Sequence, residues 1–258
     1  MNTTNFYIMR FCKKAYDKLC IISFFLMILP FVNGQEFHSK FNLSNNHLWR
    51  GMEVAAGLVY TGNLQLEGEN FYGGFWVGGN TSGSYKEFDH YIGYKTKNDR
   101  IKIELWDIYN FSPDATYNNK EYFNYSAATT GRFWDFRTYY TISEKFPLQV
   151  SWNFVMFGRD RNIENSGNKY SYFASLEYPL IRKEDLEVKG RVGYADAINS
   201  YNEKANFFSR NNGINEVSLI ISKKYAIGNI TIPLGFWAMW NPVDNKAYLQ
   251  LSLQLFSF

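Results

Sequence analysis

Cysteine is nearly absent from this sequence of 258 residues: the two that occur, Cys12 and Cys20, both lie close to the first residue. The rest of the chain can form no disulfide framework and holds no thiol for catalysis or metal binding. A chain without cysteine suits passage through an oxidising compartment. Cys20 precedes the longest apolar run instead of following it, so it is not placed as a lipid-attachment site.

Long hydrophobic runs are also missing. The longest, from Ile21 to Val32, has twelve residues, whereas a helix needs about 20 to cross a bilayer. It follows a basic stretch that includes Arg10 and Lys18, and it precedes small and polar residues up to Gly34. That order is typical of a secretory signal peptide. We predict that residues 1–34 are a cleaved signal peptide and that residues 35–258 are the mature domain, with a retained membrane anchor as the alternative.

The predicted mature domain has no net charge. Residues 1–34 hold four of the 27 basic residues and one of the 24 acidic ones, which leaves 23 of each sign in residues 35–258. The sequence therefore does not indicate a partner of nucleic acid.

Histidine is scarce, with only His38, His47 and His90. Catalysis by a general base needs that base beside a nucleophile, or a pair of carboxylates that grips water, and no nucleophile motif surrounds these residues. No Cys/His cluster or acidic loop indicates a metal site. We expect no metal, no cofactor and no enzymatic activity. A hydrolase in which His47 or His90 lies beside a serine or Asp89 is an alternative.

Aromatic residues are abundant, at 19% of the chain, although the mean hydropathy is negative. After residue 34 no helical period lasts longer than two turns, whereas alternating apolar and polar stretches recur between turn residues. For example, Val150 and Trp152 alternate with Ser151 and Asn153. Twelve strands are predicted, at residues 36–46, 54–67, 70–80, 85–97, 99–109, 131–143, 147–158, 168–180, 185–195, 214–225, 228–240 and 246–258.

The lengths and ends of these strands favour a membrane barrel over a soluble sandwich. Strands in soluble sheets usually have about five or six residues. Aromatic residues such as Tyr109 and Trp240 gather toward strand ends, as in the interfacial girdles of outer-membrane barrels. Closure would also remove exposed sheet edges. We predict an all-β fold, a single closed antiparallel transmembrane β-barrel of about twelve strands. A soluble secreted β protein is the alternative, because alternation does not say which face points inward.

The connection lengths agree with a barrel. The even-numbered connections are short, and the three long ones, residues 110–130, 159–167 and 196–213, are all odd-numbered. Alternate connections lie at the same end of such a barrel, with short turns on one side and longer loops on the other. We therefore predict short periplasmic turns, longer extracellular loops and both chain ends on the periplasmic side.

The last predicted strand is expected to close the barrel against the first. Its apolar face holds Leu249, Leu251, Leu253 and Leu255, and the chain ends in an aromatic residue, Phe258, as barrels read by the insertion machinery do. Phe256 and Phe258 nevertheless share parity with the glutamines. Either a bulge near Leu255–Phe256 shifts the alternation, or the end aromatics lie at the periplasmic rim, below the lipid. We favour the second interpretation.

Charged residues on the polar strand faces are the candidate pore lining. They are Lys102, Glu104, Asp135, Arg137, Glu187, Lys189, Arg191 and Glu216, four of each sign. A lumen of mixed sign indicates weak charge selectivity. Arg50, next to Gly51, is a further candidate, either as a cation that contacts an anionic solute or as an arginine tied to a lumen carboxylate. Because twelve strands enclose a narrower lumen than an open porin, an interlocked charge network that closes the lumen remains as plausible as an open pore.

Three motifs follow the order of a known family. They are Leu48-Trp49-Arg50-Gly51, then Phe71-Tyr72-Gly73-Gly74-Phe75-Trp76-Val77-Gly78, then Phe88-Asp89-His90-Tyr91-Ile92-Gly93-Tyr94. Over about sixty residues the chain resembles the TorF-type porin family, with Asn70 in place of the usual glycine before Phe71. The resemblance implies a small outer-membrane barrel that passes small solutes.

The combined expectation is a narrow, weakly selective porin for small polar solutes in the cell outer membrane. Its predicted partners are outer-membrane lipid, the barrel-insertion machinery and small polar solutes. The first alternative is a non-conducting outer-membrane barrel that binds a ligand or partner through the aromatic-rich loops 110–130 and 196–213. The second alternative is an outer-membrane barrel hydrolase.

Overall fold

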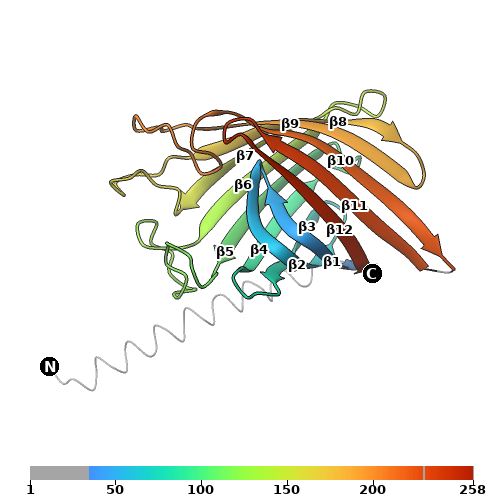
Figure 1. The fold of residues 1–258 in the computed structure, drawn as a ribbon, viewed down its shortest axis with the longest axis horizontal. Coiled ribbons are helices and arrows are strands. Elements are labelled where there is room, and N and C mark those ends of the chain that lie inside the picture. The colour runs from blue at the N-terminus through green and yellow to red at the C-terminus, as the bar shows by residue number, and fades with distance from the viewer. Residues whose placement is uncertain (1–34, 229, 258) are drawn as a thin grey trace, which may run out of the picture. The chain divides into compact units, whose positions relative to one another are not determined.

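The computed structural model describes residues 35–228 and 230–257, so the predicted signal peptide and Phe258 lie outside the described residues. Twelve strands follow one another along the chain (Figure 1). They are β1(Glu36–Trp49), β2(Met52–Glu67), β3(Phe71–Asn80), β4(Lys86–Lys95), β5(Ile101–Asn110), β6(Phe133–Thr141), β7(Gln149–Gly158), β8(Ser171–Arg182), β9(Leu186–Ala197), β10(Gly213–Ile227), β11(Ile230–Asn241) and β12(Lys246–Ser257). Each predicted strand is present, and no bound differs from its prediction by more than three residues. Within the described residues, no helix is long and apolar enough to cross a membrane.

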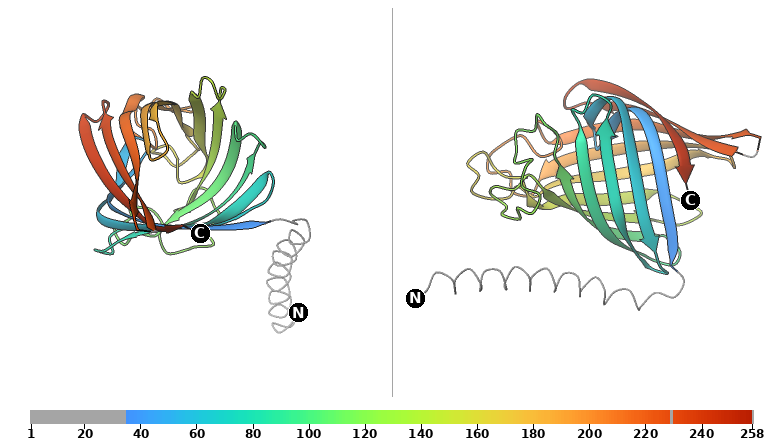
Figure 2. Two further views of the ribbon diagram at one scale, coloured as in Figure 1. Left: turned by 90° about the vertical axis from the view of Figure 1, so that its right-hand side faces the viewer. Right: turned by 90° about the horizontal axis from the view of Figure 1, so that it is seen from below.

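The strands form one closed antiparallel barrel in which β12 returns to pair with β1 (Figure 2). Pairing is regular over long stretches: β10 and β11 stay in register from Val217↔Trp240 to Ile227↔Ile230. Closure pairs the two edge strands with each other, which removes the exposed edges of an open sheet. The predicted fold class and the predicted partner of the last strand are both confirmed.

The alternation places apolar side chains outside the barrel and charged side chains inside it. Leu219 of β10 and Leu251 of β12 are exposed, whereas Glu216, on the other face of β10, is fully buried. On β12, Leu249 and Leu255 are also exposed, and Leu253 is half-buried. An apolar outer face around a polar interior is the arrangement of a membrane-spanning barrel, because lipid offers no partner for a charge.

The long connections lie together at one end of the barrel. They are residues 111–132, 159–170 and 198–212, which are the fifth, seventh and ninth connections along the chain. The turns at the other end are shorter, for example residues 68–70 and 183–185. The predicted division into short turns and longer loops is therefore confirmed.

The bulge near Leu255–Phe256, the interpretation that was not favoured from the sequence, is present in the last strand. Phe41 of β1 pairs with Phe256, but the next residue, Asn42, pairs with Gln254, so Leu255 is an extra residue on β12. This bulge shifts the alternation, and Phe256 stacks on Phe41 with 5.4 Å between ring centroids. In a β-bulge, two residues of one strand lie opposite a single residue of its partner, which changes the direction of the side chains that follow. Leu255 and Phe256 are therefore both exposed.

The ends of β1 and β2 nearest their shared turn leave the barrel wall. Toward this turn, the backbone pairing of β1 with β12 ends at Ser44↔Ser252. On the other side of the turn, the pairing of β2 with β3 begins only at Val59↔Asn80. Beyond Ser44, the side chain of Asn45 substitutes for the backbone: its amide donates to the Leu249 carbonyl at 3.0 Å and accepts from the Leu251 N–H at 2.6 Å. We refer to residues 45–58 as the tip hairpin.

Candidate functional site

The turn of the tip hairpin lies inside the barrel, against strands that are not its neighbours in the sheet. The side-chain amide of Asn215, on β10, donates to the Arg50 carbonyl at 2.9 Å, and that of Asn241, on β11, donates to the Gly51 carbonyl at 2.9 Å. Arg50 and Gly51 both have positive φ, 47° and 82°. Side chains therefore satisfy the buried carbonyls of the turn, as buried backbone groups require.

Arg50 ties the tip hairpin to the opposite wall. Its two terminal nitrogens each donate to one oxygen of Asp135, on β6, at 2.8 Å. The guanidinium also lies over the ring of Trp49, 4.6 Å from the centroid. A two-bond fork of this kind fixes geometry as well as charge. Of the two interpretations of Arg50 from the sequence, the arginine tied to a lumen carboxylate describes its position.

A first charge network lies on β5 and β6 beneath the tip hairpin. Arg137 donates to Asp135 at 2.5 Å and lies 4.0 Å from Glu104. Glu104 also lies 3.0 Å from Lys102 and accepts a hydrogen bond from the Tyr72 hydroxyl at 2.7 Å. All four predicted lining residues of these two strands are therefore in one connected network, in which each buried charge has an opposite neighbour.

A second network covers the lumen side of β8, β9 and β10. Arg191 contacts Glu177 at 2.5 Å and Glu216 at 3.4 Å, and Lys189 lies 3.3 Å from Glu177 and 3.1 Å from Glu187. Sequence analysis found four of these residues and missed Glu177. The signal was present, because Glu177 alternates with Leu176 and Tyr178 in a predicted strand.

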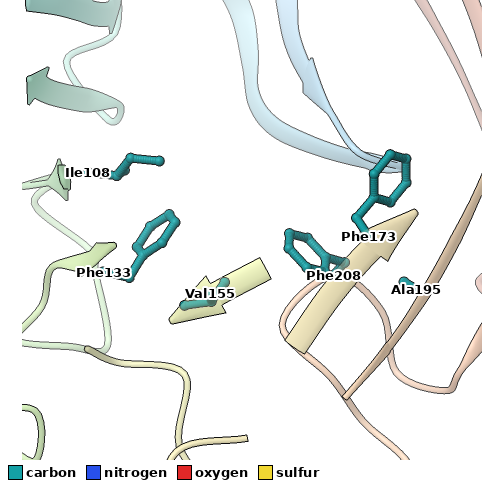
Figure 3. Close-up of a cluster of buried hydrophobic side chains, with 6 residues drawn as sticks. All are labelled: Ile108, Phe133, Val155, Phe173, Ala195 and Phe208. Carbon is teal, nitrogen blue, oxygen red and sulfur yellow. The ribbon is translucent and has the colours of Figure 1, made fainter. Parts of the chain in front are cut away.

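An aromatic and aliphatic cluster packs inside the barrel beside the tip hairpin. Its buried members are Ile108, Phe133, Val155, Phe173, Ala195 and Phe208 (Figure 3). Trp49 of the tip hairpin packs on it, with its ring centroid 5.4 Å from that of Phe208 and 6.1 Å from that of Phe133. The tip hairpin is thus held by apolar contacts as well as by Arg50.

Above this cluster, toward the long loops, lies a cavity of about 720 Å³. Three tryptophans line it, Trp49, Trp76 and Trp106, together with Phe133 and Phe207. Charged side chains also line it, and only Arg137 among them was a predicted site residue; Glu87, Asp89 and Arg159 are among those that sequence analysis missed. The volume is in the range of small-molecule sites, which are about 300–1,000 Å³.

Two of the long loops are joined over the cavity. The Lys169 ammonium, in the β7–β8 loop, lies 2.7 Å from Glu203, in the β9–β10 loop, and it also donates to the Ala205 carbonyl. The hydrogen bond from Lys169, together with one from the Ile163 backbone N–H, lowers the pKa of the Glu203 carboxyl. The third long loop contributes Tyr117 to the cavity lining.

The two histidines of the hydrolase alternative, His47 and His90, lie in different surroundings. His47 lies between aromatic rings, 5.6 Å from Trp76 and 5.8 Å from Tyr85 by centroids. The imidazole of His90 lies 3.3 Å from Asp107 on the neighbouring strand, a carboxylate that Tyr125 also contacts. Within the described residues, no group of three or more His, Cys, Asp or Glu is arranged to hold a metal ion.

These features define a class of protein: a transmembrane β-barrel whose lumen is lined by paired charges and crossed by a hairpin. No family model matches the chain, and no curated protein matches it. Solved structures are similar to it. One is an outer membrane channel from Pseudomonas putida F1, with 13% identity and a TM-score of 0.42, covering 86% of this chain and 94% of the other.

Two further structures are similar at the same level. The outer membrane channel DcaP of Acinetobacter baumannii has 9% identity and a TM-score of 0.33, covering 88% of this chain and 99% of the other. A structure from work on in-meso crystallization of membrane proteins has 11% identity and a TM-score of 0.45, covering 86% and 83%. At these identities no residue role passes from those proteins to this chain.

Proposed function

We propose that this protein is a narrow, weakly selective channel for small polar solutes in the bacterial outer membrane. The observation that carries the proposal is the pairing of an apolar outer barrel face with a lumen lined by two charge networks. An apolar exterior suits lipid, and a charged interior suits water and polar solutes. The resemblance of three motifs to those of the TorF-type porin family supports the same function.

Weak selectivity follows from the balance of the lumen charges. Each arginine and lysine of the two networks has a carboxylate beside it, for example Arg137 beside Asp135 and Arg191 beside Glu177. Neighbouring charges of opposite sign cancel beyond a few ångströms, so neither cations nor anions meet a strong barrier. Solutes pass beside the tip hairpin, between its side chains and the charged walls.

Planar-bilayer recording of the purified, folded protein tests the proposal. We expect small stepwise currents in KCl and a reversal potential near zero under a salt gradient. Glu104→Gln removes a lumen carboxylate and shifts the selectivity toward anions, whereas Arg137→Gln shifts it toward cations. Well-folded protein that gives no stepwise current contradicts a channel and leaves the alternative of a ligand-binding barrel.

The ligand-binding barrel and the barrel hydrolase are the two alternatives, and each has its own test. The cavity under the loops favours the ligand-binding barrel as second candidate, because a cavity lined by aromatic and charged side chains suits a bound molecule. A hydrolase requires activity that His47→Ala or His90→Ala abolishes.

A further inference from the structure

The cavity beneath the loops contains charged side chains that form no salt bridge with any residue the structure describes. Glu87 and Asp89 stand two residues apart on β4 and both line the cavity. Glu87 accepts a hydrogen bond from the Asn110 amide at 3.0 Å, and Asp89 accepts one from the Tyr109 backbone N–H at 3.1 Å. Among the residues that the structure describes, neither carboxylate has a lysine or arginine within 4.0 Å, and Asp89 is almost fully buried.

Arg159, in the β7–β8 loop, is the matching unpaired cation. Its guanidinium lies over the rings of Tyr117 and Phe133, at 3.8 and 5.0 Å from the centroids. Its Nε is buried without a hydrogen-bond partner, and no carboxylate of the described chain lies within salt-bridge distance. Burial lowers the pKa of Arg159, yet a guanidinium remains charged at neutral pH.

Most other charged groups of the cavity lining are already engaged. Arg137 bonds to Asp135, Lys169 to Glu203, Asp160 to Ser171, Arg161 to Asn168, and Glu53 to Asn46. Within the described residues, Glu87, Asp89 and Arg159 have no oppositely charged side chain within 4.0 Å, and Arg159 also has a buried nitrogen without a hydrogen-bond partner. A buried charge without an opposite partner is costly, so a ligand that supplies the opposite charges is stabilised in this cavity.

We propose that this cavity binds a small zwitterion, with its ammonium group at Glu87 and Asp89, its carboxylate at Arg159, and its carbon chain against the tryptophans. The site rests on the proposed channel and names its class of solute. A neutral sugar would stack on the same rings but would leave all three charges unpaired. A lone cation or a lone anion would satisfy only one side of the cavity.

Calorimetric titration of the full barrel in detergent, with the tryptophan fluorescence as second readout, tests the site. The probes are glycine, γ-aminobutyrate and ε-aminocaproate, which carry the same two charges at increasing separation. Butylamine and butyrate carry one charge each, and a neutral disaccharide carries none. We expect one zwitterion to bind at least about tenfold more tightly than either single-charge probe, since each charged hydrogen bond contributes to affinity.

Variants assign the two sides of the cavity. Arg159→Gln should weaken zwitterion binding at least about tenfold and leave butylamine binding unchanged. Glu87→Gln should also weaken zwitterion binding but leave butyrate binding unchanged. Asp89→Asn provides a second test of the acidic side if Glu87→Gln fails to fold. Arg210→Gln is the matched control, because Arg210 is exposed, pairs with Asp244 and does not line the cavity.

The outcomes separate the site from the channel. Equal binding of butylamine, butyrate and the zwitterions overturns the proposed site, as do tighter binding of the disaccharide and no binding at all. Stepwise current in KCl without zwitterion binding overturns the site and leaves the channel in place. Zwitterion binding without current supports the site and overturns the channel in favour of a ligand-binding barrel.

Discussion

Both oxygens of Asp135 accept a hydrogen bond from Arg50, each at 2.8 Å, and this fork joins two residues that are 85 positions apart in the chain. Through it the tip hairpin is fastened to β6, while Asn215 and Asn241 hold its turn from β10 and β11. The hairpin therefore spans the lumen between walls that are not adjacent in the sheet. We expect its attachment to limit how much of the lumen is free.

Arg50→Gln should release this attachment. Breaking a buried ion pair costs about 3–5 kcal/mol of unfolding free energy, and we expect the lower end because Arg137 stays bonded to Asp135. The single-channel conductance should rise, since the tip hairpin no longer spans the lumen. Denaturant unfolding and bilayer recording measure the two effects. Arg210→Gln, at an exposed pair, is the control and should change stability by at most about 1 kcal/mol. A loss of stability with unchanged conductance would show that the hairpin does not limit the current.

Gly51→Ala and Gly57→Ala form a matched pair on the tip hairpin. Their φ angles are 82° and 81°, so the backbone strain of an added Cβ is the same, about 1 kcal/mol. A Cβ at Gly51 would overlap the carbonyl oxygen of Asn215, whereas one at Gly57 meets nothing within 4 Å. Crowding of a packed site adds roughly 1–3 kcal/mol. We expect Gly51→Ala to lower the unfolding free energy by about 3 kcal/mol and Gly57→Ala by about 1 kcal/mol, measured by urea titration. Equal losses would mean that the turn is not packed against β10 in solution.

The strands could be predicted from the sequence because their period of two is local. Leu251 and Ser252 face opposite sides wherever the strand is placed, so the alternation fixed the faces of Glu104 and Glu216 without knowledge of their partners. The parity of Phe256 was the signal for the bulge at Leu255, but one extra residue cannot be told from a change of environment in a single strand.

The inward bend of the tip hairpin could not be predicted from the sequence, for a different reason. Arg50 had several inward carboxylates available, and the choice of Asp135 depends on how far the hairpin bends into the barrel. That bend arises from side chains such as Asn45, Asn215 and Asn241, whose amides look like ordinary loop or lumen residues until their partners are known. Glu87 and Asp89 stood in a predicted strand, but only the position of Arg159 distinguishes them from paired lumen carboxylates.

Acid should loosen the contact between the β7–β8 and β9–β10 loops. The pKa of Glu203 in the folded protein is lowered by Lys169, so the contact is at full strength above the ordinary glutamate pKa of about 4.3 and is lost as the pH falls through the lowered value. Current recorded between pH 7 and about pH 3 should become noisier at the acid end as the loops separate. Glu203→Gln should give the same noise at every pH. Asp114→Asn, an exposed carboxyl of the third loop, should behave as the unchanged protein does. Noise that changes with pH in Glu203→Gln would assign the effect to another group.

The two faces of β10 offer the most direct test of membrane placement. Leu219 is exposed on the outer face, and Ser222, three residues along, pairs with Glu187 on the lumen side. An arginine on the lipid face of a barrel costs about 2–4 kcal/mol near the bilayer midplane, whereas a lumen arginine stays in water. Leu219→Arg should therefore lower the unfolding free energy in lipid vesicles by up to that amount and reduce the fraction inserted. Ser222→Arg should insert as the unchanged protein does, because the new guanidinium lies beside the Glu187 carboxylate. Equal insertion and stability of the two variants would contradict a lipid-facing outer surface, and a loss confined to Ser222→Arg would mean that the faces are reversed.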